Sequence, residues 1–215
     1  MPVTPVDFAS LLCSRLCHDL LSPVGALNNG LELLSDETDP AMRARCMELL
    51  NESARVSANK LKFFRLAFGA AGGFGESVDT RECRAAIEGL LSGGRKVELG
   101  WLVEADTLPK PAAKVLLNLA MIAGDALVRG GQLAIGGEEN DGTVEIVVRA
   151  EGPRIILDPD IRRTLTDGEG EEGVTPRVAA AYLIHTLAGP VQVSEPSDNV
   201  MLFGASLGAA PGARA

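Results

Sequence analysis

Residues 16–23, which read Leu-Cys-His-Asp-Leu-Leu-Ser-Pro, lie within a long amphipathic stretch near the N-terminus. At about 100° per residue, one face of this stretch is apolar. The residues on that face are Leu12, Leu16, Leu20, Val24, Leu27, Leu31 and Leu34. The opposite, polar face holds His18 together with Asp7, Ser14, Arg15, Ser22 and Asn29. The pattern predicts a helix of about thirty residues on which His18 is exposed to solvent.

Pro23 falls inside this helical pattern. Proline lacks an N–H and its ring clashes with the preceding turn, so the carbonyl oxygen of Asp19 loses its helical partner and the helix is expected to kink. A second helix is predicted to start at Asp39 and Pro40, an N-cap followed by proline in the first position. Because only residues 35–38 separate the two helices, an antiparallel hairpin is expected.

A helical hairpin of this length cannot bury both of its apolar faces. Each helix would be about 45 Å long, and a homodimeric four-helix bundle is the simplest arrangement that covers the faces. The expected dimer contacts are Leu16, Leu20, Leu27, Cys46, Leu49 and Val56.

Composition narrows the class of protein. The chain has 215 residues, of which 46% are hydrophobic, so it is long enough to build a substantial core. A net charge of -9 argues against direct nucleic-acid binding, which needs a basic face. The sequence shows neither a targeting signal nor an apolar run long enough for a membrane span, so a cytoplasmic location without membrane contact is expected. Cys13, Cys17, Cys46 and Cys83 are expected to be small buried hydrophobes and His185 to be structural, and no metal site is predicted.

A glycine-rich segment at residues 71–75 marks a change in periodicity. We therefore predict two domains, a helical hairpin over residues 1–73 and an α/β domain over residues 74–215. Helices are expected at residues 80–91, 111–128, 159–165 and 176–187, and strands at residues 96–102, 132–136, 143–150, 191–194 and 200–206.

The histidine with a following acid and Ser22-Pro23 resembles the phosphoacceptor box of histidine kinases. Residues 15–19, Ser22 and Pro23, together with residues 64–70 at the end of the second helix, are similar to the ChpT-type histidine phosphotransferases of alphaproteobacteria. The resemblance implies an α + α/β fold. Its antiparallel hairpin would dimerise like the dimerisation and histidine phosphotransfer (DHp) domain of kinases, and a degenerate Bergerat or GHKL-like α/β sandwich would follow.

The positions at which that kinase domain binds ATP differ here. Asn118 is present, but Ile122 stands where the family has the metal-binding asparagine, and Ala150 replaces the aspartate that reads adenine. The glycine-rich lid corresponds to residues 168–173, which contain three glutamates that would repel a triphosphate. We therefore expect this chain to bind no nucleotide cofactor.

The resemblance implies a phosphorelay protein. His18 would accept a phosphoryl group from the aspartyl phosphate of one receiver domain and pass it to another receiver, without using ATP. Its neighbours on the helix are Arg15 and Ser22, which are expected to contact phosphoryl oxygens, and Asp19 would be the acid beside the phosphoacceptor. Mg²⁺ is expected on the partner receiver. The donor would be a hybrid histidine kinase, and the acceptor a CtrA-type DNA-binding regulator of the cell cycle.

Two alternatives stay open from the sequence. One is a divergent histidine kinase, distinguished by binding of ATP. The other is a non-catalytic dimeric scaffold or phosphatase for a response regulator, distinguished by whether His18 ever carries phosphate.

Overall fold

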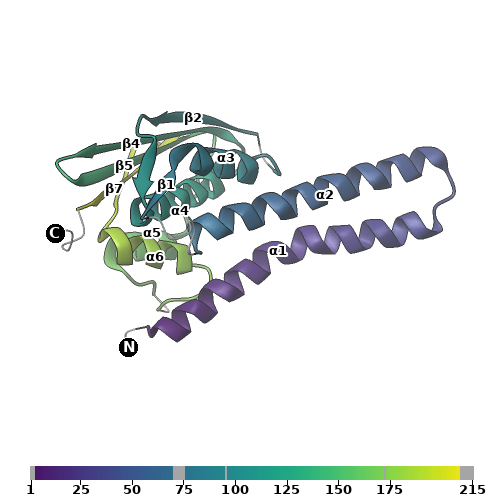
Figure 1. Ribbon diagram of the computed structural model, residues 1–215, viewed down its shortest axis with the longest axis horizontal. Helices are drawn as coiled ribbons and strands as arrows, with labels where there is room; N and C mark the ends of the chain where they lie inside the picture. The colour runs from purple at the N-terminus through teal and green to yellow at the C-terminus, as the bar shows by residue number, and fades with distance from the viewer. Residues whose placement is uncertain (1–2, 70–75, 95, 172, 209–215) are drawn as a thin grey trace.

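Two long helices form the N-terminal part of the computed structural model, which describes residues 3–69, 76–94, 96–171 and 173–208. Helix α1 spans Pro5–Asp36 and helix α2 spans Pro40–Ala67. They form an antiparallel hairpin whose closed end extends away from the rest of the molecule (Figure 1). At Gly30 of α1 a Cβ would come within 2.9 Å of a Leu50 methyl group, so the absence of a side chain there lets the two helices pack closely.

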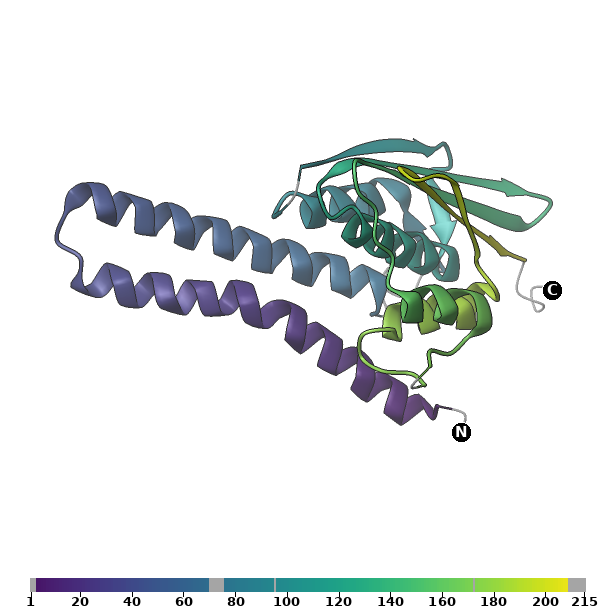
Figure 2. The same ribbon diagram turned by 180° about the vertical axis from the view of Figure 1, so that it is seen from behind.

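Both helices start at a capped N-terminus, and the start of α2 at Asp39 and Pro40 agrees with the prediction. The side chain of Thr4 caps α1, and that of Asp39 caps α2 by accepting from the N–H of Met42 at 3.0 Å. Helix α1 changes direction part-way along its length (Figures 1 and 2), and Pro23, which is buried, lies inside it. Loss of one intrahelical hydrogen bond and the ring clash of an interior proline account for such a bend.

The rest of the chain is an α/β sandwich. Its helices are α3 (Thr80–Leu91), α4 (Lys110–Ala126), α5 (Pro159–Asp167) and α6 (Ala179–Ala188). Its main strands are β2 (Val97–Val103), β4 (Gly131–Asn140), β5 (Thr143–Glu151), β6 (Gln192–Ser197) and β7 (Val200–Leu207). They form one sheet in the order β2-β4-β5-β7-β6, in which β2 and β4 are parallel and the other pairs antiparallel. The helices cover one face of this sheet (Figures 1 and 2).

The elements agree with the sequence-based prediction except at short segments. Strands β1 (Ser77–Asp79) and β3 (Thr107–Pro109) were not predicted, because three residues are too few to show an alternating pattern. They pair only with each other, in a separate two-stranded sheet. Helix α6 begins at Ala179, three residues after the predicted start at Pro176, and its N-cap is Val178.

The hairpin and the α/β domain share one hydrophobic core. Phe63, Phe64, Leu66 and Ala67, in the last turns of α2, are buried in the same cluster as the apolar face of α4 and the inner face of the sheet. The predicted glycine-rich boundary, residues 71–75 and the division at residue 73, lies outside the described residues. In packing terms the end of α2 is part of the α/β domain, so the two predicted units do not have separate cores.

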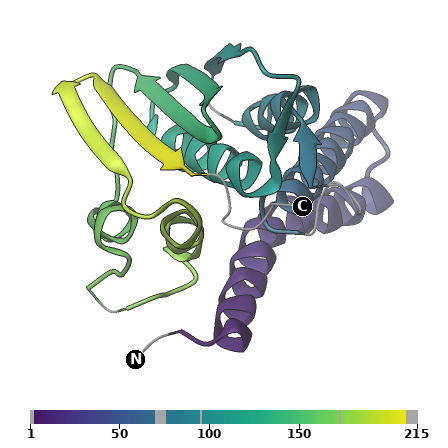
Figure 3. The ribbon, with the colours of Figure 1, turned by 60° about the vertical axis from the view of Figure 1, so that its left-hand side comes forward.

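The start of α1 also packs on the α/β domain. Leu16 and Leu20 lie against the shared core, and the rings of Phe8 and Tyr182 meet edge to face with centroids 5.2 Å apart. The N-terminal half of α1 therefore lies beside α6 (Figure 3). Leu16 and Leu20, which the sequence predicts as dimer contacts, are partly buried against this core within one chain, and their part in a dimer stays a prediction. Cys46, another predicted dimer contact, is buried within this chain.

The cysteines divide into two groups. Cys46 and Cys83 are buried, and burial raises the pKa of the Cys83 thiol to about 12. Cys13 and Cys17 are exposed, so their predicted burial is wrong. Each follows a residue of the apolar stripe of α1 directly, and one position along a helix turns the side chain by about 100° away from that stripe. Through the described parts of the chain, helices long and apolar enough to cross a membrane are absent.

Candidate functional site

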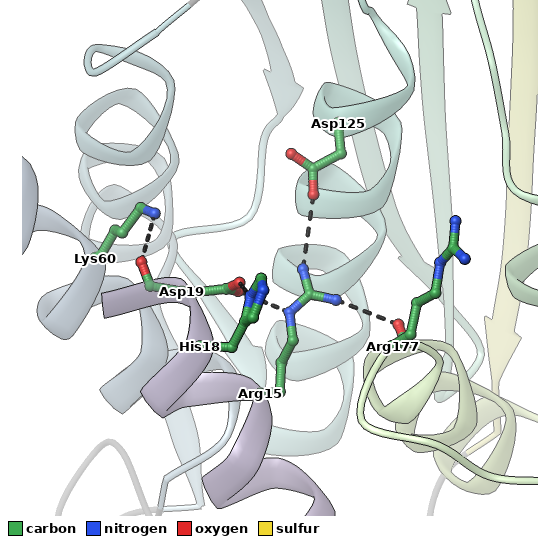
Figure 4. Close-up of polar contacts among 6 residues, drawn as sticks. All are labelled: Arg15, His18, Asp19, Lys60, Asp125 and Arg177. Atoms are coloured by element: carbon green, nitrogen blue, oxygen red, sulfur yellow. Dashed lines mark hydrogen bonds and ion pairs between the residues drawn. The ribbon is translucent and has the colours of Figure 1, made fainter. Parts of the chain in front are cut away.

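His18 projects from the polar side of α1, and 83% of its side chain is exposed. Its Nδ1 lies 3.1 Å from Oδ1 of Asp19 (Figure 4). A carboxylate accepts hydrogen bonds, so this contact places the proton of a neutral ring on Nδ1 and leaves the lone pair on Nε2. Nε2 is thereby available as a nucleophile toward solvent or a docked partner.

The Asp19 carboxylate is held by Arg15, one helical turn earlier. Nε of Arg15 donates to Oδ2 of Asp19 at 2.7 Å, and both side chains are only 18% exposed. The other guanidinium nitrogens of Arg15 reach the second domain, where Nη1 donates to the carbonyl oxygen of Arg177 at 3.2 Å and Nη2 lies 3.8 Å from Oδ2 of Asp125. Figure 4 shows Arg15 between α1 and these two groups.

The position of Arg15 differs from the role that the sequence predicted. As a neighbour of His18 on the helix, Arg15 was expected to contact phosphoryl oxygens, but its donors point to Asp19 and to the second domain. The pattern of one helix cannot reveal acceptors that lie more than a hundred residues away in the chain.

The carbonyl oxygen of Asp19 has a partner that the sequence analysis missed. Pro23, four residues later, has no N–H to donate to it. In the structure Nζ of Lys60, on α2, donates to this oxygen at 2.8 Å (Figure 4). The proline indicates that the oxygen needs a donor, because buried backbone acceptors are nearly always paired, but only the folded hairpin shows which side chain supplies it. Asp19 is therefore fixed at its backbone by α2 and at its carboxylate by Arg15.

We predict that Lys60 and Pro23 are energetically coupled. Lys60→Ala should lower the free energy of unfolding by about 1 kcal/mol in the wild type, because the Asp19 oxygen loses its donor. In a Pro23→Ala background an N–H is restored at residue 23, so the same substitution should cost less. Urea denaturation at one fixed protein concentration measures both values. The exposed Lys62→Ala is the matched control. Equal losses in both backgrounds would contradict the assignment.

Three further residues of α1 lie near His18, of which Ser22 was predicted as part of the site. Ser22 is exposed one turn after the histidine, on the same side of α1, as the spacing predicts. Leu21 is 69% exposed, whereas Leu11 is half-buried. The surface around His18 thus combines an imidazole, a hydroxyl and one large apolar side chain.

Comparison with known proteins identifies the family. Residues 80–193 match the family model described as the histidine phosphotransferase C-terminal domain. The chain is 36% identical over 190 residues to the protein phosphotransferase ChpT of Brucella abortus (strain 2308), across 87% of this chain and 89% of that protein. The chain belongs to the ChpT-type histidine phosphotransferases.

Solved structures agree with this assignment. This histidine phosphotransferase matches the structure of a bacterial phosphotransferase with a TM-score of 0.84 and 31% identity, over 95% of this chain and 98% of that one. The Acinetobacter baumannii histidine kinase AdeS matches with a TM-score of 0.46 and 14% identity, over 89% of this chain and 97% of that one. The α + α/β fold class expected from the sequence is confirmed.

Asn118, which the sequence analysis compared with the nucleotide site of kinases, has a packing role in this phosphotransferase. Asn118 is fully buried on α4, and its Nδ2 donates to the carbonyl oxygens of Ala67 and Lys114 at 3.2 and 2.8 Å. Its amide therefore ties α4 to the last turn of α2. The Oδ1 atom of Asn118 is buried and has no hydrogen-bond partner among the described residues.

A hollow of about 370 Å³ lies between α1, α4 and the helices α5 and α6. Ile122 and the apolar side chains of α5 and α6 line much of this hollow. Two polar residues of its lining have partners: Asp158 caps α5 and pairs with Arg177, and Arg15 pairs with Asp19. Ala150 is buried in the sheet. Across the described residues, clusters of three or more His, Cys, Asp or Glu side chains suited to a metal ion are absent.

The second histidine of the phosphotransferase has a packing role. Nδ1 of His185 lies 3.1 Å from the carbonyl oxygen of Leu165, so α6 is hydrogen-bonded to the end of α5. A Cβ at Gly168, whose φ is +91°, would come within 2.8 Å of Nε2 of this ring. The ring therefore sits against backbone, and glycine satisfies both the close approach and the left-handed conformation. This placement agrees with the structural role expected from the sequence.

Proposed function

We propose that His18 is the residue through which this histidine phosphotransferase passes a phosphoryl group between receiver domains. The observation that supports it is an imidazole whose side chain is 83% exposed and whose Nδ1 contacts a carboxylate held by Arg15. A surface histidine without a role does not need a neighbouring carboxylate that is fixed in this way.

Transfer of a phosphoryl group from an aspartyl phosphate to histidine needs an exposed, correctly oriented ring nitrogen. The lone pair of Nε2 attacks the phosphorus of an aspartyl phosphate, a P–N bond forms, the P–O bond to the aspartate breaks, and the aspartate leaves as a carboxylate. The ring gains positive charge because the Nδ1 proton stays in place, and the adjacent Asp19 carboxylate stabilises that charge. Transfer to the next receiver is the reverse reaction at a different aspartate. We propose that Mg²⁺ is supplied by the receiver domain.

The first prediction concerns the phosphorylated residue. Label from a phosphorylated receiver domain should transfer to the wild-type chain as an acid-labile, alkali-stable phosphoramidate, and His18→Ala should abolish it. His185→Ala is the control, because that ring lies against Gly168 and Leu165 rather than at the surface of α1. Denaturing electrophoresis after acid and alkali treatment measures both. Persistent label in the His18 variant would refute the assignment, and a wild type that only accelerates loss of label from the receiver would favour a phosphatase.

We also propose that this transfer uses no ATP. Support comes from Ile122 and Ala150, which offer methyl groups where a nucleotide site needs oxygen ligands and hydrogen-bond acceptors. Isothermal titration with millimolar ATP and Mg²⁺ is expected to show no saturable heat, and incubation with γ-labelled ATP no label at His18. An active histidine kinase should be run in parallel. A saturable isotherm together with label on His18 would support the divergent-kinase alternative.

We propose that the chain is a homodimer formed by the far part of the hairpin. Large apolar side chains remain exposed there, and two pairs of them are spaced seven residues apart, so each pair lies on one helix face. These residues are Val24 and Leu31 on α1 and Met42 and Leu49 on α2, exposed by 44, 56, 42 and 44%. A second copy of the same surface would bury all four in a four-helix bundle.

Leu49→Glu should therefore convert the protein to a monomer. A two-fold interface would bury two unpaired carboxylates, and each costs several kcal/mol to bury. Leu33→Glu is the matched control, because Leu33 is also on the hairpin and 59% exposed but lies about 200° around the helix from Leu31. Light scattering of the three proteins measures the masses. A folded monomeric wild type, or a dimeric Leu49 variant, would contradict the proposal.

Response regulators are the partner class of this family. We propose that the donor is the receiver domain of a hybrid histidine kinase and that the acceptors include a CtrA-type DNA-binding regulator of the cell cycle, in the cytoplasm. The family resemblance supports this choice, and the exposed Leu21 one turn from His18 provides an apolar contact for a receiver.

A further inference from the structure

Arg15 is a side chain of α1 that reaches both the Asp19–His18 pair and the second domain. Its guanidinium contacts acceptors on α1, on α4 and in the segment before α6. Fixing a long side chain costs conformational entropy, and an arginine with donors satisfied in several directions recovers that cost through charge-assisted hydrogen bonds. The 18% exposure of its side chain further screens these contacts from water.

The side chain of Arg15 lies between two hollows in the surface and lines both. One has a volume of about 370 Å³ and the other of about 230 Å³, and Arg15, Met121 and Asp125 line both. At this place α1 and α4 are therefore connected across open space by a polar bridge. A few turns earlier on α1, the Phe8–Tyr182 ring contact holds α6 against the same helix.

We propose that Arg15 is a positioning residue through which the second domain fixes the tautomer of His18. The proposal rests on the proposed role of His18 as phosphoacceptor. Neighbouring residues on a helix diverge by about 100°, so Asp19 reaches the His18 ring only when its carboxylate is turned toward it. Arg15 holds Oδ2, which leaves Oδ1 at 3.1 Å from Nδ1 of the ring.

The chemical consequence concerns Nε2. With Oδ1 in place the neutral ring carries its proton on Nδ1, and the nucleophilic lone pair is on the outward nitrogen. Without that acceptor, a ring that is 83% exposed exchanges between both tautomers in water, and a smaller fraction presents Nε2 for attack. Arg15 touches neither the ring nor the phosphoryl group in this account, and it acts through Asp19.

The test is a direct measurement of the tautomer in the full-length protein. The chain has only two histidines, so ¹⁵N-histidine labelling gives two rings in a long-range ¹⁵N correlation spectrum. His185, whose Nδ1 contacts the Leu165 carbonyl oxygen, is the internal reference. The wild type should show His18 with its proton on Nδ1. Arg15→Ala should shift His18 toward the Nε2–H form, leave His185 unchanged and slow phosphotransfer about tenfold at saturating receiver.

Two variants separate positioning from simple loss of charge. Arg15→Lys keeps a cation that reaches Asp19. A lysine lacks the planar guanidinium whose several N–H donors can also reach the Arg177 carbonyl oxygen, so this variant should give an intermediate tautomer population and an intermediate rate of phosphotransfer. Arg55→Ala removes an exposed arginine that pairs with Glu52 elsewhere on the hairpin, and it should leave both measurements unchanged.

The contribution of the second domain is tested with Phe8→Ala. This substitution loosens the contact between α1 and α6 without altering Arg15 and should shift His18 in the same direction by a smaller amount. An unchanged His18 in this variant would refute coupling to the second domain.

Other outcomes overturn the whole proposal. If Arg15→Ala slowed transfer while the His18 tautomer stayed unchanged, Arg15 would act on the phosphoryl group or the receiver instead. If neither tautomer nor rate changed, Arg15 would have no role at the site. The spectrum is recorded on unphosphorylated protein, so its result is independent of whether His18 accepts phosphate, which the His18→Ala labelling decides.

Discussion

The site depends on the hydrogen bond between Lys60 and the carbonyl oxygen of Asp19. Pro23 removes the helical donor for this oxygen and bends α1, which leaves a strong acceptor next to His18. Lys60 pairs it from α2 at 2.8 Å. The same residue whose backbone is fixed in this way presents its carboxylate to His18, so the bend in the helix, the packing of the hairpin and the orientation of the imidazole are one connected arrangement.

The second domain supports the hairpin through its core as well as through Arg15. Phe63 and Phe64 are buried among residues of α4 and the sheet, and Asn118 donates to the last carbonyl of α2. The buried amide of Asn118 thus joins α4 to the end of α2, in the same core that holds the two phenylalanines.

The two halves of the hairpin have different surroundings. The near half of the hairpin packs against the α/β domain and holds the site, while the far half leaves apolar side chains such as Leu31 and Leu49 exposed. One long helix therefore serves two purposes along its length, since its bend at the middle allows the N-terminal half to follow the second domain and the other half to stay with α2.

The sequence by itself determined the main helices and strands and the exposure of His18. Each of the features behind them depends on residues close together in the chain, so the sequence alone predicts it. These features are the caps at Thr4 and Asp39, the apolar stripe of α1 and the interior proline. Exposure of His18 and burial of Ala150 follow from the same periodicities. Tertiary structure decided everything that joins distant segments: that Leu16 and Leu20 face the second domain, that Arg15 binds Asp19 and the Arg177 carbonyl, and that Lys60 supplies the donor lost at Pro23. These contacts depend on which surfaces meet in space, and helical periodicity gives a side chain's direction but not its partner.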